Sequence, residues 1–82
     1  MLFGNKIYDK YSLSYSRKGK KNGYNAEIVY SCIHNYYFFL IENTKRDYIF
    51  NSLWHFNGFS DEEECMIACE NKIDELISNK YN

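Results

Sequence analysis

The fold is decided by residues 59–77, which read FSDEEECMIACENKIDELI. Ser60 followed by Glu63 has the pattern of a capping box, in which each side chain accepts a backbone N–H of the first helical turn. The acidic residues at 61, 62 and 64 place negative charge where the helix dipole favours it. At about 100° per residue, six apolar side chains then form one stripe: Cys65, Met66, Cys69, Ile73, Leu76 and Ile77. We expect one helix over about residues 61–79 that covers a sheet.

The residues before this helix alternate between apolar and polar side chains, as β-strands do. We expect strands at about residues 7–16, 24–33, 36–42 and 48–56. The basic segment from Arg17 to Gly23 reads as a turn, with Asn22-Gly23 as its hairpin signal. The predicted class is α+β: one domain, residues 1–82, with a four-stranded antiparallel meander followed by one C-terminal helix (ββββα).

One helix can cover only one face of this sheet, yet the strand at 36–42 is apolar on both faces. We expect Phe39 to face the helix, together with Val29, Ile33, Ile41, Ile49 and Leu53. The other face would then carry Tyr30, Tyr36, Phe38, Tyr48, Phe50 and Trp54. Exposed apolar patches usually mark interaction sites, so we predict that these six residues bind a partner. The alternative is that residues 1–10 fold back over this face.

Charge is divided unevenly along the chain. Residues 1–46 hold eight basic and three acidic side chains, whereas residues 47–82 hold two basic and eight acidic ones. The acidic helix is either a capped, solvated face or a partner surface, whose outward residues would be Glu64, Ile67, Asn71, Asp74 and Glu75. The basic hairpin is either a solubilising loop or a nucleic-acid contact made by Arg17, Lys18, Lys20 and Lys21.

Residue types that carry chemistry are few. Cys65 and Cys69 lie in the apolar stripe, so we interpret them as reduced core thiols. A zinc site would also need two of Cys32, His34 and His55, at a spacing that matches no standard zinc finger. We therefore predict no metal, no cofactor and no catalytic residue. No apolar run is long enough for a membrane span, and the N-terminus does not read as a signal peptide, so we expect a cytoplasmic protein.

Two resemblances follow from these features. The segment GFSDEEEC, residues 58–65, resembles the strand-to-helix junction of AP2-type and integrase arm-binding domains, whose three-stranded sheets read DNA. Where those sheets place arginines, this chain has tyrosine and phenylalanine. The small size, the Asn-, Lys-, Ile- and Tyr-rich composition and the acidic helix resemble bacteriophage accessory proteins, of which anti-CRISPR and other anti-defence inhibitors are typical.

The sequence thus favours a non-enzymatic binding protein that inhibits or modulates a macromolecular partner, as a viral anti-defence factor would. The expected partner is a protein, with a host defence nucleoprotein complex and a second copy of the chain as candidates. The alternative function is a small DNA- or RNA-binding domain that uses the Arg17–Lys21 segment and exposed aromatic residues.

Overall fold

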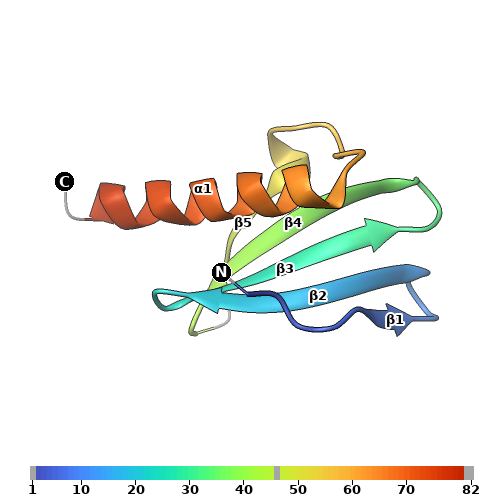
Figure 1. The fold of residues 1–82 in the computed structure, drawn as a ribbon. Coiled ribbons are helices and arrows are strands. Elements are labelled where there is room, and N and C mark those ends of the chain that lie inside the picture. Colours follow the sequence, from blue (N-terminus) through green and yellow to red (C-terminus); the bar gives the residue numbers. More distant parts are fainter. Residues whose placement is uncertain (1, 46, 81–82) are drawn as a thin grey trace.

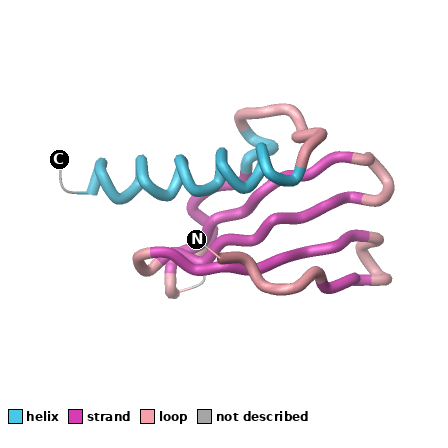
Figure 2. Tube along the Cα trace, viewed as in Figure 1, coloured by secondary structure: helices cyan, strands magenta, loops and turns pink. Residues whose placement is uncertain are grey.

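The chain forms two layers, a five-stranded antiparallel sheet and a single helix packed on one of its faces (Figures 1 and 2). The computed structural model describes residues 2–45 and 47–80, apart from the side chains of Tyr48 and Lys80. Its elements are β1 (Ile7–Asp9), β2 (Ser14–Lys21), β3 (Tyr24–Ser31), β4 (Tyr36–Asn43), β5 (Tyr48–Asn51), the 3₁₀ turn η1 (Ser52–Trp54) and α1 (Glu62–Lys80). The strands are ordered in the sheet as in the chain. The α+β class with a C-terminal helix is confirmed, but the sheet has five strands rather than four.

The predicted first strand, residues 7–16, is wrong because a turn divides it into β1 and β2. Asp9 Oδ1 accepts the Tyr11 N–H at 2.9 Å, and Leu13 takes a positive φ of 51°. Residues 17–21, expected as a turn, are instead the second half of β2. The reversal itself lies at Asn22 and Gly23, whose φ values of 49° and 85° suit a two-residue hairpin, as predicted.

The predicted fourth strand, residues 48–56, ends early at Asn51. The Asn51 side chain accepts the Leu53 N–H at 2.9 Å and starts η1 in place of further strand. Where β5 no longer pairs with β4, backbone groups of β4 form hydrogen bonds with residues that follow β5. Ser52 Oγ accepts the buried Phe39 N–H at 2.9 Å, and Tyr37 exchanges two backbone hydrogen bonds with Phe59.

The core lies between α1 and the middle of the sheet. Its buried residues come from three strands and the helix: Ala26, Ile28, Phe39, Ile41, Phe50, Cys65, Cys69 and Ile73. Met66, Leu76 and Ile77 pack against this cluster, so the predicted helix stripe is confirmed. The helix-facing position of Phe39 is confirmed as well, since its side chain is fully buried in this cluster.

Several other expected positions are wrong. Phe50, expected on the uncovered face, lies in the helix-side core with 7% exposure. Val29, expected beneath the helix, alternates with Ile28 and therefore points to the other face of the sheet. Ile33 lies exposed in the β3–β4 turn, and Leu53 is exposed in η1.

The helix is capped one residue later than the sequence pattern indicates. Asp61 Oδ2 accepts the Glu64 N–H at 3.1 Å, and the Asp61 carbonyl accepts the first helical hydrogen bond, from Cys65. Asp61 is therefore the N-cap residue, and Ser60 lies outside the helix.

We expect Asp61→Ala to lower the free energy of unfolding by about 1 kcal/mol, because the Glu64 N–H loses its acceptor. Ser60→Ala is the matched control and should leave the urea midpoint close to that of the native chain. A Ser60→Ala variant that loses as much stability as Asp61→Ala would contradict this assignment of the cap.

Gly58 allows the segment before α1 to approach the sheet closely. A Cβ atom at this position would overlap the ring of Tyr36, whereas one at Gly4 would make only an ordinary contact at 3.6 Å. We expect Gly58→Ala to cost about 1–3 kcal/mol in thermal or urea unfolding, since Tyr36 must move aside. Gly4→Ala should change stability by much less, and equal effects of the two substitutions would argue against this packing.

Candidate functional site

The residues predicted to bind a partner do not form one surface. Tyr36 and Phe38 lie on the sheet face opposite the helix, and Trp54 is exposed in η1. Tyr30 points to the helix side of β3, where its ring lies 4.7 Å from that of Tyr37. The helix residues of the predicted set are all exposed: Glu64, Ile67, Asn71, Asp74 and Glu75. The Tyr48 side chain lies outside the described residues. The structure therefore offers two candidate surfaces on opposite layers of the molecule.

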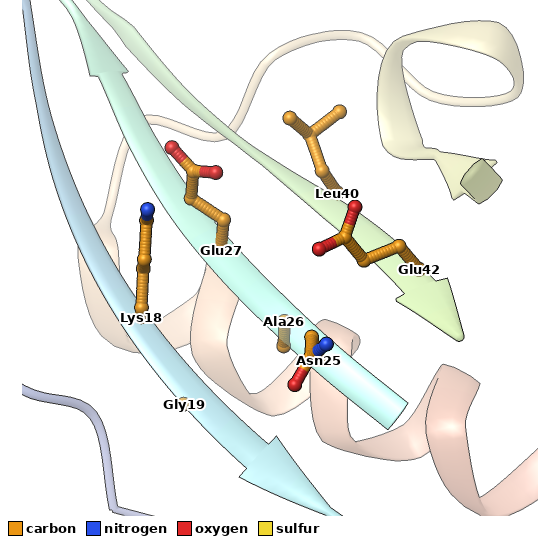
Figure 3. A pocket seen from close by; sticks show the side chains of 7 residues that line it. All are labelled: Lys18, Gly19, Asn25, Ala26, Glu27, Leu40 and Glu42. Carbon is orange, nitrogen blue, oxygen red and sulfur yellow. The ribbon is translucent and has the colours of Figure 1, made fainter. Parts of the chain in front are cut away.

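The first surface is the sheet face that α1 leaves uncovered, here called the open sheet face. It is formed by alternate residues of the three central strands: Ser14, Ser16, Lys18 and Lys20 of β2, Asn25, Glu27, Val29 and Ser31 of β3, and Tyr36, Phe38, Leu40 and Glu42 of β4. Figure 3 shows Lys18, Glu27 and Leu40 on this face, with the helix behind the strands. They help to line a hollow of about 530 Å³.

The open sheet face is apolar toward one end and charged toward the other. Val29 is only 7% exposed and lies between Ser16 and Phe38 across the strands. The charged end carries Lys18 and Lys20 on β2, and Glu27 and Glu42 on the neighbouring strands. Two positive and two negative charges leave this face close to neutral.

The N-terminal segment lies along the sheet edge and toward the helix. Phe3 packs against the helix-side core, and the Gly4 N–H donates to the Lys18 carbonyl at 2.8 Å. Lys6 forms an ion pair with Glu62 of α1 at 3.1 Å. The alternative that this segment covers the open sheet face is therefore wrong for its described residues.

The basic and acidic halves of the sequence meet within the molecule. Arg17 Nη1 lies 2.6 Å from Glu62 Oε1, and Lys21 Nζ lies 2.8 Å from Asp74 Oδ1. Odd-numbered residues of β2 face the helix, so these two cations are directed at α1, while Lys18 and Lys20 point away from it. Of the four cations assigned to nucleic-acid binding, two are thus engaged in ion pairs with the helix.

Glu62 is the central acid of this arrangement. Burial acts to raise the pKa of its carboxyl group, but hydrogen bonds from Arg17 and Lys6, together with their charges, outweigh burial and hold that pKa below its usual value of 4.5. A lowered pKa in the folded state means that the ionised carboxylate stabilises the fold above the unfolded pKa. That stabilisation is lost as the pH falls through the folded value.

We therefore expect the native chain to lose stability as the pH falls below about 4.5, the usual value of this group. Glu62→Gln should be less stable than the native chain at neutral pH, and its stability should depend less on pH over the acid range. Glu64→Gln, which removes an outward carboxylate of the same turn, is the control and should keep the native pH dependence. Urea unfolding at several pH values measures all three, and parallel native and Glu62→Gln curves would exclude this role.

The second surface is the segment between β5 and α1, here called the exposed connection, which carries three exposed apolar side chains within residues 53–56: Leu53, Trp54 and Phe56. Trp54 is 62% exposed, Phe56 53% and Leu53 37%. Their backbone is held in place, because the N–H groups of His55 and Phe56 both donate to the Ser52 carbonyl. Sequence alternation placed Trp54 and Phe56 on a strand, and the early end of β5 presents them here instead.

The exposed connection adjoins one flank of the acidic helix. The His55 ring stacks on that of Phe50 at 5.1 Å, and the Lys72 ammonium lies 4.6 Å from the centre of the same Phe50 ring. Lys72 in turn lies 3.3 Å from Glu75. This chain of contacts joins η1 to the outward face of α1, on which Ile67 is 53% exposed.

Ser31 and His34 form a pair that the sequence analysis missed. Ser31 Oγ lies 3.0 Å from His34 Nδ1 and also accepts the His34 N–H at 3.2 Å. The pair belongs to one exposed turn, and the His34 ring stacks on Tyr36. The contact is a turn-closing hydrogen bond of the kind that serine commonly makes to a residue three positions on.

The helix cysteines are buried thiols. Burial raises the pKa of Cys65 and of Cys69 to about 12, so both are protonated at neutral pH, a state unsuited to nucleophilic attack or metal binding. Within residues 2–45 and 47–80, no three His, Cys, Asp or Glu side chains are placed to hold a metal ion. The described helices include none that is long and apolar enough to cross a membrane.

Comparison of the chain with protein-family models, with characterised proteins and with solved structures finds no match. The functional assignment therefore rests on the two surfaces themselves.

Proposed function

We propose that this chain is a non-enzymatic binding protein that inhibits or modulates a protein partner through the exposed connection and the acidic outer face of α1. The observation that carries the proposal is the exposure of three large apolar side chains, Leu53, Trp54 and Phe56, within four consecutive residues. Tryptophan is enriched among the residues that dominate binding energy at protein interfaces. An 82-residue chain has a small core, so leaving three large apolar side chains exposed to water gives up apolar burial that would stabilise the fold.

The exposed connection is ordered by hydrogen bonds within the chain itself. Its ends are fixed by Ser52, which bonds to β4, and by Phe59, which pairs with Tyr37. The Leu53 N–H is held by the Asn51 side chain between these points. A segment already ordered in the free protein loses little conformational entropy on binding, so more of the contact energy appears as affinity.

The charge beside the connection indicates the character of the partner. Glu63, Glu64 and Glu75 are exposed on α1, and Lys72 already lies close to Glu75. An apolar anchor rimmed by acids suits a basic surface that contains an apolar pocket. Basic surfaces are typical of proteins that bind nucleic acid, so the chain would compete with nucleic acid for its partner.

This mode of action agrees with the resemblance to anti-defence proteins in size and composition. A defence nucleoprotein complex must hold its nucleic acid in a positively charged channel, and an acidic surface with an aromatic anchor could occupy such a channel. Inhibition of this kind needs affinity alone, so the proposal includes no catalytic step. Direct nucleic-acid binding is less well supported, because Arg17 and Lys21 are paired with helix acids.

The proposal is tested by affinity capture from host lysates with the native chain and with Trp54→Ala. We expect a specific protein to be retained by the native chain and lost with Trp54→Ala, because this removes the largest side chain of the exposed connection, which is 62% exposed. Retention should weaken as the salt concentration rises, since acidic residues face a basic surface.

Tyr11→Ala is the matched control, because Tyr11 is an aromatic residue with 88% exposure in the turn between β1 and β2. It should capture the same protein as the native chain. Equal capture by the native chain and Trp54→Ala would exclude the exposed connection as the binding surface. A chain that instead binds generic duplex DNA, with a steep salt dependence, would favour the nucleic-acid alternative.

A further inference from the structure

We propose that the open sheet face binds a second copy of the chain, so that two sheets pack face to face about a twofold axis that runs along β3. The proposal concerns the layer opposite the exposed connection and does not depend on the proposed function. Packing two twisted sheets with nearly aligned strands is a common arrangement, with about 10 Å between the sheets. A twofold interface requires a surface that complements itself, and the strand register gives this face that property.

The complementarity begins with side-chain size. Across the sheet, Ser16 of β2 is in register with Val29 of β3, which is in register with Phe38 of β4. A twofold axis along β3 places β2 of one copy over β4 of the other. Phe38 of each copy then lies over the second copy's Ser16, so that a large ring meets a small side chain.

The next row toward the β3–β4 turn repeats this arrangement. Ser14, Ser31 and Tyr36 are in register, so each Tyr36 would lie over the second copy's Ser14. Two rows of large side chains thus meet two rows of small ones, as close packing between sheets requires. Val29 lies on the axis and meets its own equivalent.

Charge follows the same symmetry. Lys20, Asn25 and Glu42 form one row across the sheet, so each Glu42 lies over the second copy's Lys20, and this contact occurs twice. In the row of Lys18, Glu27 and Leu40, the two Glu27 side chains meet across the axis, and each has the Lys18 of its own chain beside it on the neighbouring strand. The rotation therefore pairs opposite charges between the copies at Lys20 and Glu42, and Lys18 offsets the charge of Glu27 within each chain.

The extent of the face indicates a dimer of moderate strength. Strands β2, β3 and β4 are each eight residues long, so at ~3.3 Å per residue and ~4.8 Å per strand they span roughly 400 Å² per copy. The accessible surface is larger than this flat area, and the pair would bury about 1,000 Å², near the lower limit for a specific interface. We expect a dissociation constant in roughly the micromolar range.

A charged partner fits this face less well than a second copy. Its two lysines are offset by Glu27, Glu42 and Asp9 of β1, so the face has no net positive charge to attract a polyanion. Phe3 and Lys6 turn toward the helix, and β1 extends the face only at its edge, where Ile7 is in register with Ser16. Tyr36, Phe38 and Leu40 are partly exposed, and a second copy packed on this face would cover them.

The first experiment is sedimentation over a concentration series with the native chain, Phe38→Glu and Ile67→Glu. The native chain should dimerise, and Phe38→Glu should weaken the dimer roughly 100-fold, because a carboxylate would be buried without a partner. Ile67→Glu places the same change at an exposed apolar site of the helix layer and should leave the dimer intact. Trp54→Ala should also dimerise normally, which separates this proposal from the proposed function.

The second experiment uses charge reversal and does not alter the apolar centre. Lys20→Glu and Glu42→Lys should each weaken self-association by roughly tenfold, since each variant would place like charges together at two sites. Mixed in equal amounts, the two variants should form a heterodimer about as strong as the native dimer, because both contacts between positions 20 and 42 then join opposite charges.

Three outcomes would overturn the proposal: a native chain that remains monomeric at its highest soluble concentration, a Phe38→Glu chain that folds and dimerises like the native one, or charge variants that associate no better when mixed. If the native chain remains monomeric, the open sheet face would have to bind a different protein. If Phe38→Glu fails to fold, the charge-reversal pair still decides the question.

Discussion

A single helix has to close the core of a five-stranded sheet, and most of the structure follows from this constraint. The helix has 19 residues and the sheet is wider than one helix, so apolar packing is concentrated on β3, β4 and β5. The flank toward β2 is closed by charge instead, through Arg17 with Glu62 and Lys21 with Asp74. The segregation of charge along the sequence is therefore a means of fixing the helix on the sheet.

The same constraint leaves the two surfaces on which the functional proposals rest. The helix covers one face, so the opposite face keeps its apolar side chains accessible. The connection from β5 to the start of α1 must cross from the sheet layer to the helix layer (Figure 1), and Trp54 within it is exposed. A dimer through the sheet would keep both exposed connections on its outer sides, where two partner molecules could be bound at once.

The sequence predicts the features that local chemistry controls. The Asn22-Gly23 turn, the apolar helix stripe and the helix-facing Phe39 are all found in the structure. The acidic first turn offers several cap residues one position apart, so pattern alone selected Ser60 where the structure uses Asp61. Small errors of this kind come from choices between neighbouring residues of equal propensity.

Larger errors arose where tertiary contacts override local pattern. Arg17 to Lys21 lacks apolar alternation, because its inward positions meet acids of the helix rather than the core, and it was therefore read as a turn. Phe50 was placed on the wrong face, since the aliphatic residues that include Ile49 were expected to face the helix, whereas Phe50 lies in register with Ile41 in the core. The exposed connection was missed because residues 48–56 were treated as one continuous strand, although Asn51 ends β5.

The backbone hydrogen bonds along the β4 edge also oppose pairing of this edge with strands of other molecules. Past the end of β5, the outward backbone groups of Phe39 and Tyr37 are taken by the Ser52 hydroxyl and by Phe59. An incoming strand from a misfolded neighbour would have to displace these bonds before it could extend the ladder. The short β1 and β5 offer few backbone groups at the outer edges of the sheet, so fibre-like growth from strand to strand is discouraged. Stacking of further copies strand on strand, as in amyloid, is thus opposed at this edge by bonds that the folded chain already makes.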